Sequence, residues 1–215
     1  MKPDFSENHV FVMDTDRYYS QVKDSYEGVL TEQECKKALR FLRVEDYRNY
    51  VARKYFVRKL LAVYLDEGPQ EITFQLSAQK KPYIEGIEFN VSHSAEMAVI
   101  ALSKAPVGID IEFVKTDFSY HTLLADCFDS EEQDAIHKAN DQLLAFYTLW
   151  TRKEALLKAS GDGLVKEQLN EVNVLQNKTV HHRKTYHLFS TLLTENYMMS
   201  TAFTLSSIKT HYWNV

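Results

Sequence analysis

The chain has 215 residues, 45% of them hydrophobic, which suffices for one large domain or two small ones that share an interface. Its net charge of -5, from 25 Lys+Arg against 30 Asp+Glu, argues against a general affinity for nucleic acid or for membrane surfaces. The two cysteines lie far apart, the N-terminus lacks a signal-peptide core, and no segment approaches transmembrane length, so we expect a soluble cytoplasmic monomer without a disulfide framework or a zinc ribbon.

The first half of the chain is predicted to run from a strand through helices to several strands. An apolar run over 9–13 indicates a buried strand, and a polar connection follows it. Thr31 followed by Glu34 is a capping box that begins a helix. A longer helical pattern over 45–65 stops at Gly68-Pro69. Further strands are expected at 72–76, 89–94 and 97–102, the last folding back onto 107–112 as an antiparallel hairpin.

The second half repeats this order of helices followed by strands. A helix begins near Asp129 or Ser130, and a long helix from Asp141 to Ser160 ends at Gly161. Strands are predicted at 172–175, 186–193 and 198–205. Since no linker rich in Pro, Gly or Ser separates the halves, we place the boundary at 103–104 and expect the two halves, 1–103 and 104–215, to pack tightly.

Two carboxylates share one face of the strand predicted at 107–112. Side chains alternate along a strand, so Asp110 and Glu112 point one way while the intervening isoleucines are buried. The pair could be the solvent face of an ordinary amphipathic strand. However, adjacent acids repel unless a cation neutralises them, and Gly108 on the same face leaves room for something large. We therefore hypothesise that they hold Mg²⁺ and a phosphate ester.

The long helix adds a third carboxylate and an ammonium group. Helical spacing places four residues on one ridge: Phe146, Trp150, Glu154 and Lys158. A Glu and a Lys four residues apart are commonly a surface ion pair, but the two aromatic residues seek burial and bring Glu154 to the edge of the core. Arg152 and Lys153 are expected to face solvent.

The strand at 89–94 is expected to run into a turn at its end, where Ser92 and His93 lie. With Lys80 and Lys81 nearby, they form a compact set of phosphate donors. Ordinary turn chemistry explains Ser and Asn equally well, and a Ser-His hydrolase lacks its G-x-S-x-G elbow. The basic helix between Arg40 and Lys59 is either a solvated face or a surface for an acidic partner or a nucleotide phosphate.

Three motifs together resemble the 4′-phosphopantetheinyl transferases of the surfactin-synthetase-activating (Sfp-like) class. They are Asn90-Val91-Ser92-His93-Ser94, Val107-Gly108-Ile109-Asp110-Ile111-Glu112, and Trp150-Thr151-Arg152-Lys153-Glu154 through Lys158. The resemblance implies an α+β fold of two similar halves around a pseudo-twofold axis. It also implies transfer of phosphopantetheine from coenzyme A to a serine of an acyl or peptidyl carrier protein, with release of 3′,5′-ADP.

The resemblance also implies roles for individual residues. Asp110, Glu112 and Glu154 would hold Mg²⁺ on the pyrophosphate, and Glu154 would take the proton of the carrier serine. Lys158 would neutralise the attacked phosphate. The nucleotide of coenzyme A would be bound by Ser92, His93, Arg53, Lys81 and Pro82. The first half would thus hold coenzyme A, and the second half would carry the metal and catalytic residues.

This sequence departs from the family at one loop, where Lys80-Lys81-Pro82 replaces Gly-Lys-Pro. The basic residues near the N-terminus that contact coenzyme A are assigned only provisionally to Lys37 and Arg40. Two alternatives stay open: a Mg²⁺-dependent phosphohydrolase that uses the same carboxylates, and a non-catalytic module that binds a nucleotide or an acidic protein through its basic helix.

Overall fold

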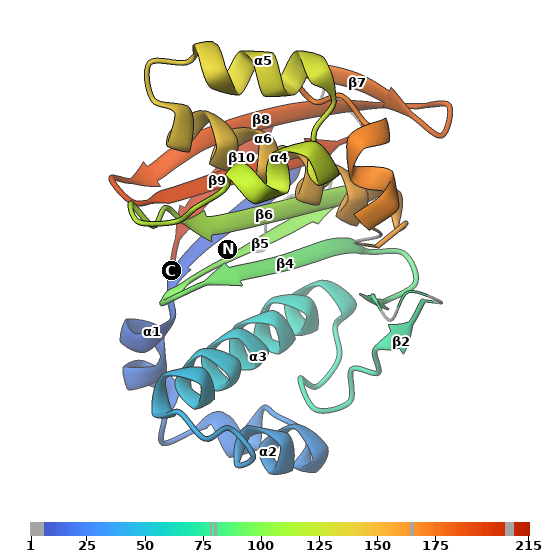
Figure 1. Cartoon of the computed structure of the whole chain (residues 1–215). Coiled ribbons are helices and arrows are strands. Elements are labelled where there is room, and N and C mark those ends of the chain that lie inside the picture. The colour runs from blue at the N-terminus through green and yellow to red at the C-terminus, as the bar shows by residue number, and fades with distance from the viewer. Residues whose placement is uncertain (1–6, 78, 80, 164–165, 205–208) are drawn as a thin grey trace.

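Two four-stranded sheets, each covered by helices, form the framework of the computed structural model, which describes residues 7–77, 79, 81–163, 166–204 and 209–215 (Figure 1). The first sheet has the strand order β10-β1-β5-β4 and the second has the order β6-β9-β8-β7. Helices α1–α3 lie toward one end of the molecule and α4–α6 toward the other. This is the predicted α+β architecture of two halves.

The first half begins with β1 (Asn8–Asp14), and Asp14 caps α1 (Thr15–Val22), where the sequence had indicated only a polar connection. The predicted capping box of Thr31 and Glu34 is confirmed at the start of α2. The other elements of the first half are η1 (Tyr26–Gly28), α2 (Glu32–Ala38), α3 (Val44–Leu65), β2 (Gln75–Leu76), β3 (Pro82–Tyr83), β4 (Glu88–Ser94) and β5 (Met97–Ser103).

The second half begins with β6 (Val107–Phe113), and its long helix α6 (Gln142–Ser160) has the predicted boundaries. Asp141 caps the start of α6, and Gly161, at φ 85°, ends it in the left-handed conformation that favours glycine. The other elements are α4 (His121–Cys127), α5 (Ser130–Lys138), η2 (Lys166–Glu171), β7 (Lys178–His181), β8 (Lys184–Thr194), β9 (Tyr197–Phe203) and β10 (Thr210–Asn214).

The expected hairpin between 97–102 and 107–112 is wrong. Both edges of β5 are already occupied, by β1 and β4, so β6 crosses to the second sheet and pairs with β9 instead. The last strand, β10, returns to the first sheet and runs parallel to β1. The division of the chain at 103–104 stays a prediction.

Three apolar clusters hold these layers together. One lies between the first sheet and α3, and a second lies between the second sheet and α4–α6. The third joins the two sheets, with Val10 and Val99 from one side meeting Ile109 and Met199 from the other. Strands β1 and β5 are thus buried on both faces, which explains their nearly unbroken apolar sequence. Among the described residues, no helix is long and apolar enough to cross a membrane.

Candidate active site at the junction of the two sheets

Helix α6 packs directly onto β6, and Gly108 permits this contact. A Cβ atom at Gly108 would lie 1.9 Å from the backbone oxygen of Ala155 and 2.6 Å from the nitrogen of Ala159. The large group that approaches this glycine is therefore the backbone of α6. The close approach brings Glu154 and Lys158 of the helix to the strand face that carries Asp110.

Lys158 links the carboxylates of strand and helix. Its Nζ lies 2.6 Å from Oδ1 of Asp110 and 3.6 Å from Oε2 of Glu154, and it also donates to the Ser92 hydroxyl at 3.1 Å. Ser92 in turn donates to Asp110 at 2.7 Å. The other oxygen of Asp110, Oδ2, is buried and has no hydrogen-bond partner among the residues that the structure describes. An ionised oxygen buried in this way requires a cation or a proton.

Glu112 lies on the same strand face as Asp110, toward its end. It accepts a hydrogen bond of 3.0 Å from Ser94, whose hydroxyl oxygen also accepts from the backbone nitrogen of Phe113 at 3.0 Å. The nearest oxygens of Asp110, Glu112 and Glu154 do not all come within 4.8 Å of one another. The ammonium of Lys158 contacts both Asp110 and Glu154. The orienting role of Ser94 had no separate signal in the sequence.

Burial and mutual repulsion disfavour ionisation of the three carboxyl groups. Burial, followed by the charge of Asp110, raises the pKa of Glu154 to about 7. The same two causes raise the pKa of Glu112, and burial raises that of Asp110. For Lys158, burial disfavours the charged form, but the carboxylates of Asp110 and Glu154 outweigh it and raise the pKa. One ammonium does not balance three acids, so the site has the charge pattern that a divalent cation neutralises.

Side chains alternate along β4, so Ser92 and His93, which were both predicted to bind phosphate, lie on opposite faces of the strand. Asn90, Ser92 and Ser94 face β6, where Asn90 accepts a hydrogen bond of 2.9 Å from the backbone nitrogen of Ile109. His93 points to the other side and lines a cavity of about 1370 Å³ together with Arg53. The sequence had grouped Ser92 with His93, whereas the pleat of the strand assigns them to different surroundings.

Basic and acidic side chains both line the cavity around His93, among them Arg53, Lys54 and Asp46. Asn49 orients Arg53, because the Nε of Arg53 donates a hydrogen bond of 2.5 Å to the side-chain oxygen of Asn49. The side-chain nitrogen of Asn49 in turn donates to the backbone oxygen of Ala95 at 3.0 Å. Partial burial, with the nearby charges of Arg53 and Lys158, lowers the pKa of His93 to about 4. Burial also lowers the pKa of Arg53 to about 10. A bound anion would therefore stabilise the charged forms of both side chains.

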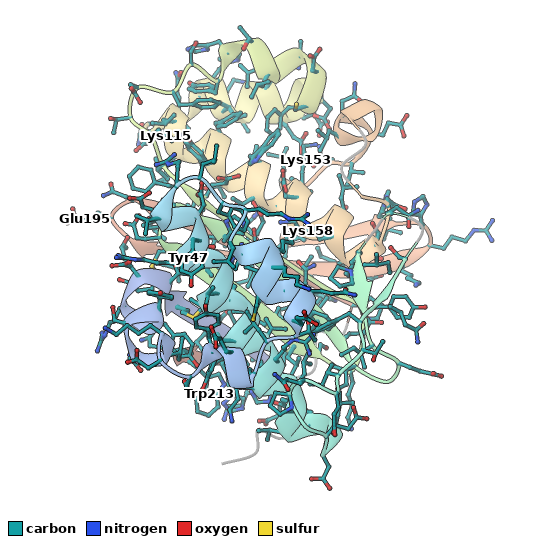
Figure 2. All side chains as sticks on the ribbon, turned by 90° about the horizontal axis from the view of Figure 1, so that it is seen from below. Tyr47, Lys115, Lys153, Lys158, Glu195 and Trp213 are labelled. Carbon is teal, nitrogen blue, oxygen red and sulfur yellow. The ribbon has the colours of Figure 1, made fainter. Side chains whose placement is uncertain are left out.

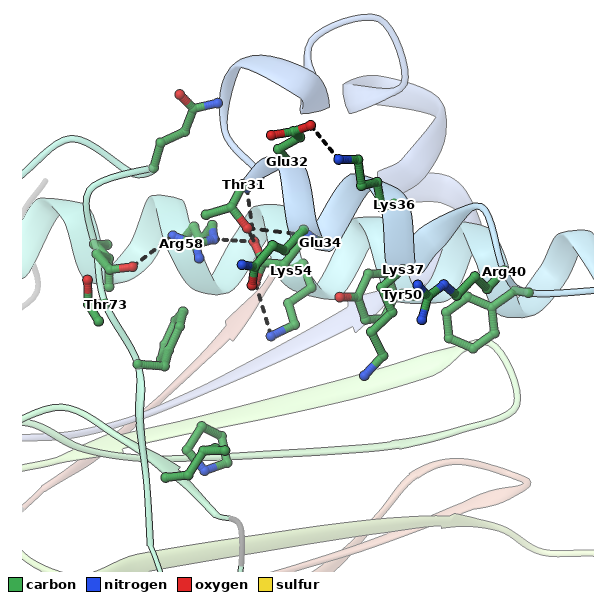
Figure 3. A pocket seen from close by; sticks show the side chains of 17 residues that line it. Thr31, Glu32, Glu34, Lys36, Lys37, Arg40, Tyr50, Lys54, Arg58 and Thr73 are labelled. Atoms are coloured by element: carbon green, nitrogen blue, oxygen red, sulfur yellow. Dashed lines mark hydrogen bonds and ion pairs between the residues drawn. The ribbon is translucent and has the colours of Figure 1, made fainter.

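A second cavity, of about 1250 Å³, adjoins the first and shares Lys37 and Lys54 with it (Figure 3). It also contains Arg40 and Pro82. The provisional residues Lys37 and Arg40 therefore lie in the same region as the predicted nucleotide contacts. Two acidic residues, Glu32 and Glu34, also line this cavity, and Glu34 pairs with Lys54 at 3.2 Å and with Arg58 at 2.5 Å.

Lys81 connects the loop before β3 to the end of α6. Its Nζ donates to the backbone oxygen of Lys158 at 2.8 Å, although Lys81 lies in the other half of the chain. Burial lowers the pKa of Lys81. Lys80, which replaces the usual glycine of the family, lies outside the described residues.

The expectation that Arg152 and Lys153 face solvent is wrong. Lys153 lies on the same helix as Lys158 (Figure 2). Its side chain is 1% exposed and forms an ion pair of 2.6 Å with Glu132. Arg152 binds the backbone oxygens of Val174 and Leu175 at 3.0 Å each. These contacts also explain why the strand predicted at 172–175 is absent, since its carbonyl groups accept from α6 rather than from another strand.

Comparison with known proteins identifies the family. Residues 106–202 match the 4′-phosphopantetheinyl transferase superfamily, and residues 21–105 match the N-terminal domain of 4′-phosphopantetheinyl transferases. The chain is 30% identical to the 4′-phosphopantetheinyl transferase HetI of Nostoc sp. strain PCC 7120, over 80% of this chain and 76% of that protein.

Two further relatives carry the same activity in their names. The 4′-phosphopantetheinyl transferase gsp of Aneurinibacillus migulanus is 30% identical over 79% of this chain and 74% of its own. The 4′-phosphopantetheinyl transferase Sfp of Bacillus subtilis strain 168 is 29% identical over 69% of this chain and 68% of its own. With both halves matched and the motifs in place, the chain belongs to the 4′-phosphopantetheinyl transferase family and is an enzyme of that class.

Proposed function

We propose that the protein transfers the 4′-phosphopantetheine group of coenzyme A to a serine hydroxyl of an acyl or peptidyl carrier protein, in a Mg²⁺-dependent reaction that releases 3′,5′-ADP. The observation that supports this most directly is the meeting of Asp110 and Lys158, beside Glu112 and Glu154. One buried oxygen of Asp110 has no partner within the described ranges. Oxygen donors of this kind suit Mg²⁺ in the presence of substrate phosphates.

Asp110, Glu112 and Glu154 are the residues that would hold the metal ion. Mg²⁺ bound there supplies Lewis acidity toward the pyrophosphate of coenzyme A. The ammonium of Lys158, already directed at Asp110, would neutralise charge on the phosphate under attack. Glu154, whose carboxylate the bound metal ion would keep ionised, would accept the serine proton directly or through water.

The nucleotide of coenzyme A would lie in the two cavities, which are lined mainly by residues of the first half. His93 and Arg53 line the larger cavity and present donors to the 3′-phosphate, while Pro82 lines the smaller one. Lys81 would complete this surface from its position against the end of α6. Ser92 would contact the 3′-phosphate from the side of β4 that faces β6, where its hydroxyl also contacts Asp110 and Lys158.

The test is mass spectrometry of a purified apo carrier protein incubated with the enzyme, coenzyme A and Mg²⁺. The proposal expects a mass increase of about 340 Da, the phosphopantetheine group delivered by metal-assisted attack on the pyrophosphate. A carrier whose acceptor serine is replaced by alanine is the matched control, and added EDTA should stop the reaction. Hydrolysis of coenzyme A without a mass increase on any carrier tested would instead favour the phosphohydrolase.

A further inference from the structure

Three side chains with metal-binding atoms meet beyond the end of α6, away from the carboxylates described above. His181 is the last residue of β7, His182 follows it in the turn to β8, and Asp162 lies in the loop after α6. Nε2 of His181 lies 2.7 Å from Oδ2 of Asp162, and Nε2 of His182 lies 3.2 Å from the same oxygen. Among the described residues, this is the one group of three or more His, Cys, Asp or Glu whose ligand atoms all lie within 4.8 Å of one another.

The spacing of these atoms matches the edges of a small coordination polyhedron. With metal-ligand distances of about 2.0–2.1 Å, two ligands of a tetrahedral zinc ion lie about 3.3 Å apart. For a zinc ion to replace the shared protons, the His181 distance would lengthen by about 0.6 Å, and the His182 distance would stay nearly unchanged. Both imidazoles present Nε2 to the carboxylate, and this ring nitrogen is able to bind a metal ion.

The surrounding chain holds the three ligands in place. Ser160 donates to Oδ2 of Asp162 at 2.6 Å. Burial disfavours the charged carboxyl, but the hydrogen bonds from Ser160 and His181 outweigh it and lower the pKa of Asp162, so the carboxylate is an anion at neutral pH. The hairpin turn is formed by His182 at φ 47° and Arg183 at φ 62°, positions that Asn and Gly usually occupy, and it directs both imidazoles to one side.

We propose that Asp162, His181 and His182 form a second metal site, which binds a divalent transition-metal ion of the zinc class with solvent in the remaining position. Two imidazoles and one carboxylate suit Zn²⁺, Co²⁺ or Ni²⁺ and disfavour Mg²⁺, which prefers oxygen ligands. The site is thus chemically distinct from the three carboxylates between β6 and α6. The proposal does not depend on the transferase reaction.

The bound ion would fasten the β7–β8 hairpin to the end of the catalytic helix. The loop that carries Asp162 also contacts the first half of the chain, since a Cβ at Gly163 would lie 3.6 Å from the side chain of Gln79. Lys81, two residues further on, binds the backbone of Lys158. An ion that binds only the folded protein stabilises it by mass action, so metal should raise the melting temperature.

The experiment uses untagged full-length protein with excess Mg²⁺ present to occupy the carboxylate site. Co²⁺ is titrated as a spectroscopic probe, and Zn²⁺ is then added to displace it. We expect visible d–d absorption that saturates at one Co²⁺ per chain and disappears with Zn²⁺. His182→Ala should weaken binding more than about tenfold, because losing a direct ligand exceeds the effect of losing an outer-shell partner. His182 has an exposed side chain, so this variant is expected to fold.

Two matched variants decide where the ion binds. His137→Ala removes an exposed histidine of α5 outside the cluster and should leave Co²⁺ affinity unchanged. Asp110→Asn alters the carboxylate site and should likewise retain the Co²⁺ spectrum. The proposal is overturned if wild-type protein gives no saturable Co²⁺ spectrum, if His182→Ala binds as tightly as wild type, or if Asp110→Asn abolishes binding. In each case Asp162 and the two histidines would be only a hydrogen-bonded cluster.

Discussion

Nζ of Lys158 on α6 lies 2.6 Å from Oδ1 of Asp110 on β6, and this contact joins the two elements that carry the acidic residues of the site. The ion pair is partly buried, and Ser92 binds both partners. The remaining Asp110 oxygen has no hydrogen-bond partner in the described part of the chain, although the group is almost fully buried. The pair thus places an internal cation on one oxygen of Asp110 and leaves the other to be satisfied by a cation or a proton.

Replacing Asp110 by Asn should abolish most of the activity while the fold survives. The amide keeps the shape of the side chain but cannot neutralise a metal ion, so we expect the rate of carrier modification to fall at least about a hundredfold. Circular dichroism should show an unchanged helical content. Glu154→Gln should behave similarly. Modification by either variant at the wild-type rate would refute the metal assignment.

His93→Ala should weaken the binding of coenzyme A through loss of its 3′-phosphate contact. The measurement compares KM for coenzyme A with KM for its 3′-dephospho form. We expect the wild-type preference for coenzyme A to shrink about tenfold, in the range of one hydrogen bond to a charged group. The exposed His137→Ala variant serves as control. An unchanged preference in His93→Ala would remove this residue from the proposed nucleotide site.

The lowered pKa of His93 predicts that the free energy of unfolding depends on pH. Its pKa is lowered from 6.5 to about 4 by burial and by the charges of Arg53 and Lys158. Between these values the unfolded chain binds a proton that the folded chain does not, so the free energy of unfolding decreases as the pH falls from about 6.5 toward 4.

The His93→Gln variant isolates this contribution. Urea unfolding at several pH values should show less loss of stability below pH 6.5 in the variant, and the difference between the two proteins should be constant above about pH 7.5. Parallel curves for the two proteins throughout the acid range would show that His93 titrates normally.

Gly108→Ala should strongly destabilise the protein, because a methyl group there would overlap the backbone of Ala155 at 1.9 Å. Backbone atoms of a packed helix cannot rotate aside, so α6 must move away from β6. We expect a loss of about 3 kcal/mol or more in unfolding free energy and a loss of activity. Gly28→Ala is the control, since a Cβ atom added at Gly28 would have no neighbour within 4 Å. Equal stabilities of the two variants would contradict the close packing.

Lys153→Met should be destabilising although it leaves the catalytic groups intact. Lys153 and Glu132 form an ion pair in which both side chains are 1% exposed or less. Removing one partner leaves a buried charge, at a loss of about 3–5 kcal/mol. The exposed pair of Lys138 and Asp134 provides the control, where Lys138→Met should change stability by less than about 1 kcal/mol. Thermal or denaturant unfolding measures both.

The sequence by itself determined the local features of this protein. Helix boundaries follow from short-range chemistry, so the cap at Asp141, the stop at Gly161 and the capping box of Thr31 and Glu34 were all predictable. Strand alternation likewise placed Asp110 and Glu112 on one face, and the three spaced motifs indicated the family that the comparisons show.

Only the tertiary structure decided which elements meet. The pairing of β6 with β9 depends on the occupied edges of β5, and the burial of Lys153 depends on Glu132 from α5, neither of which is encoded in local periodicity. The same holds for Lys158, whose partner lies 48 residues away, and for the approach of His181 to Asp162. Such contacts arise from packing over long sequence separations, where a pattern fixes the face of an element but not its neighbour.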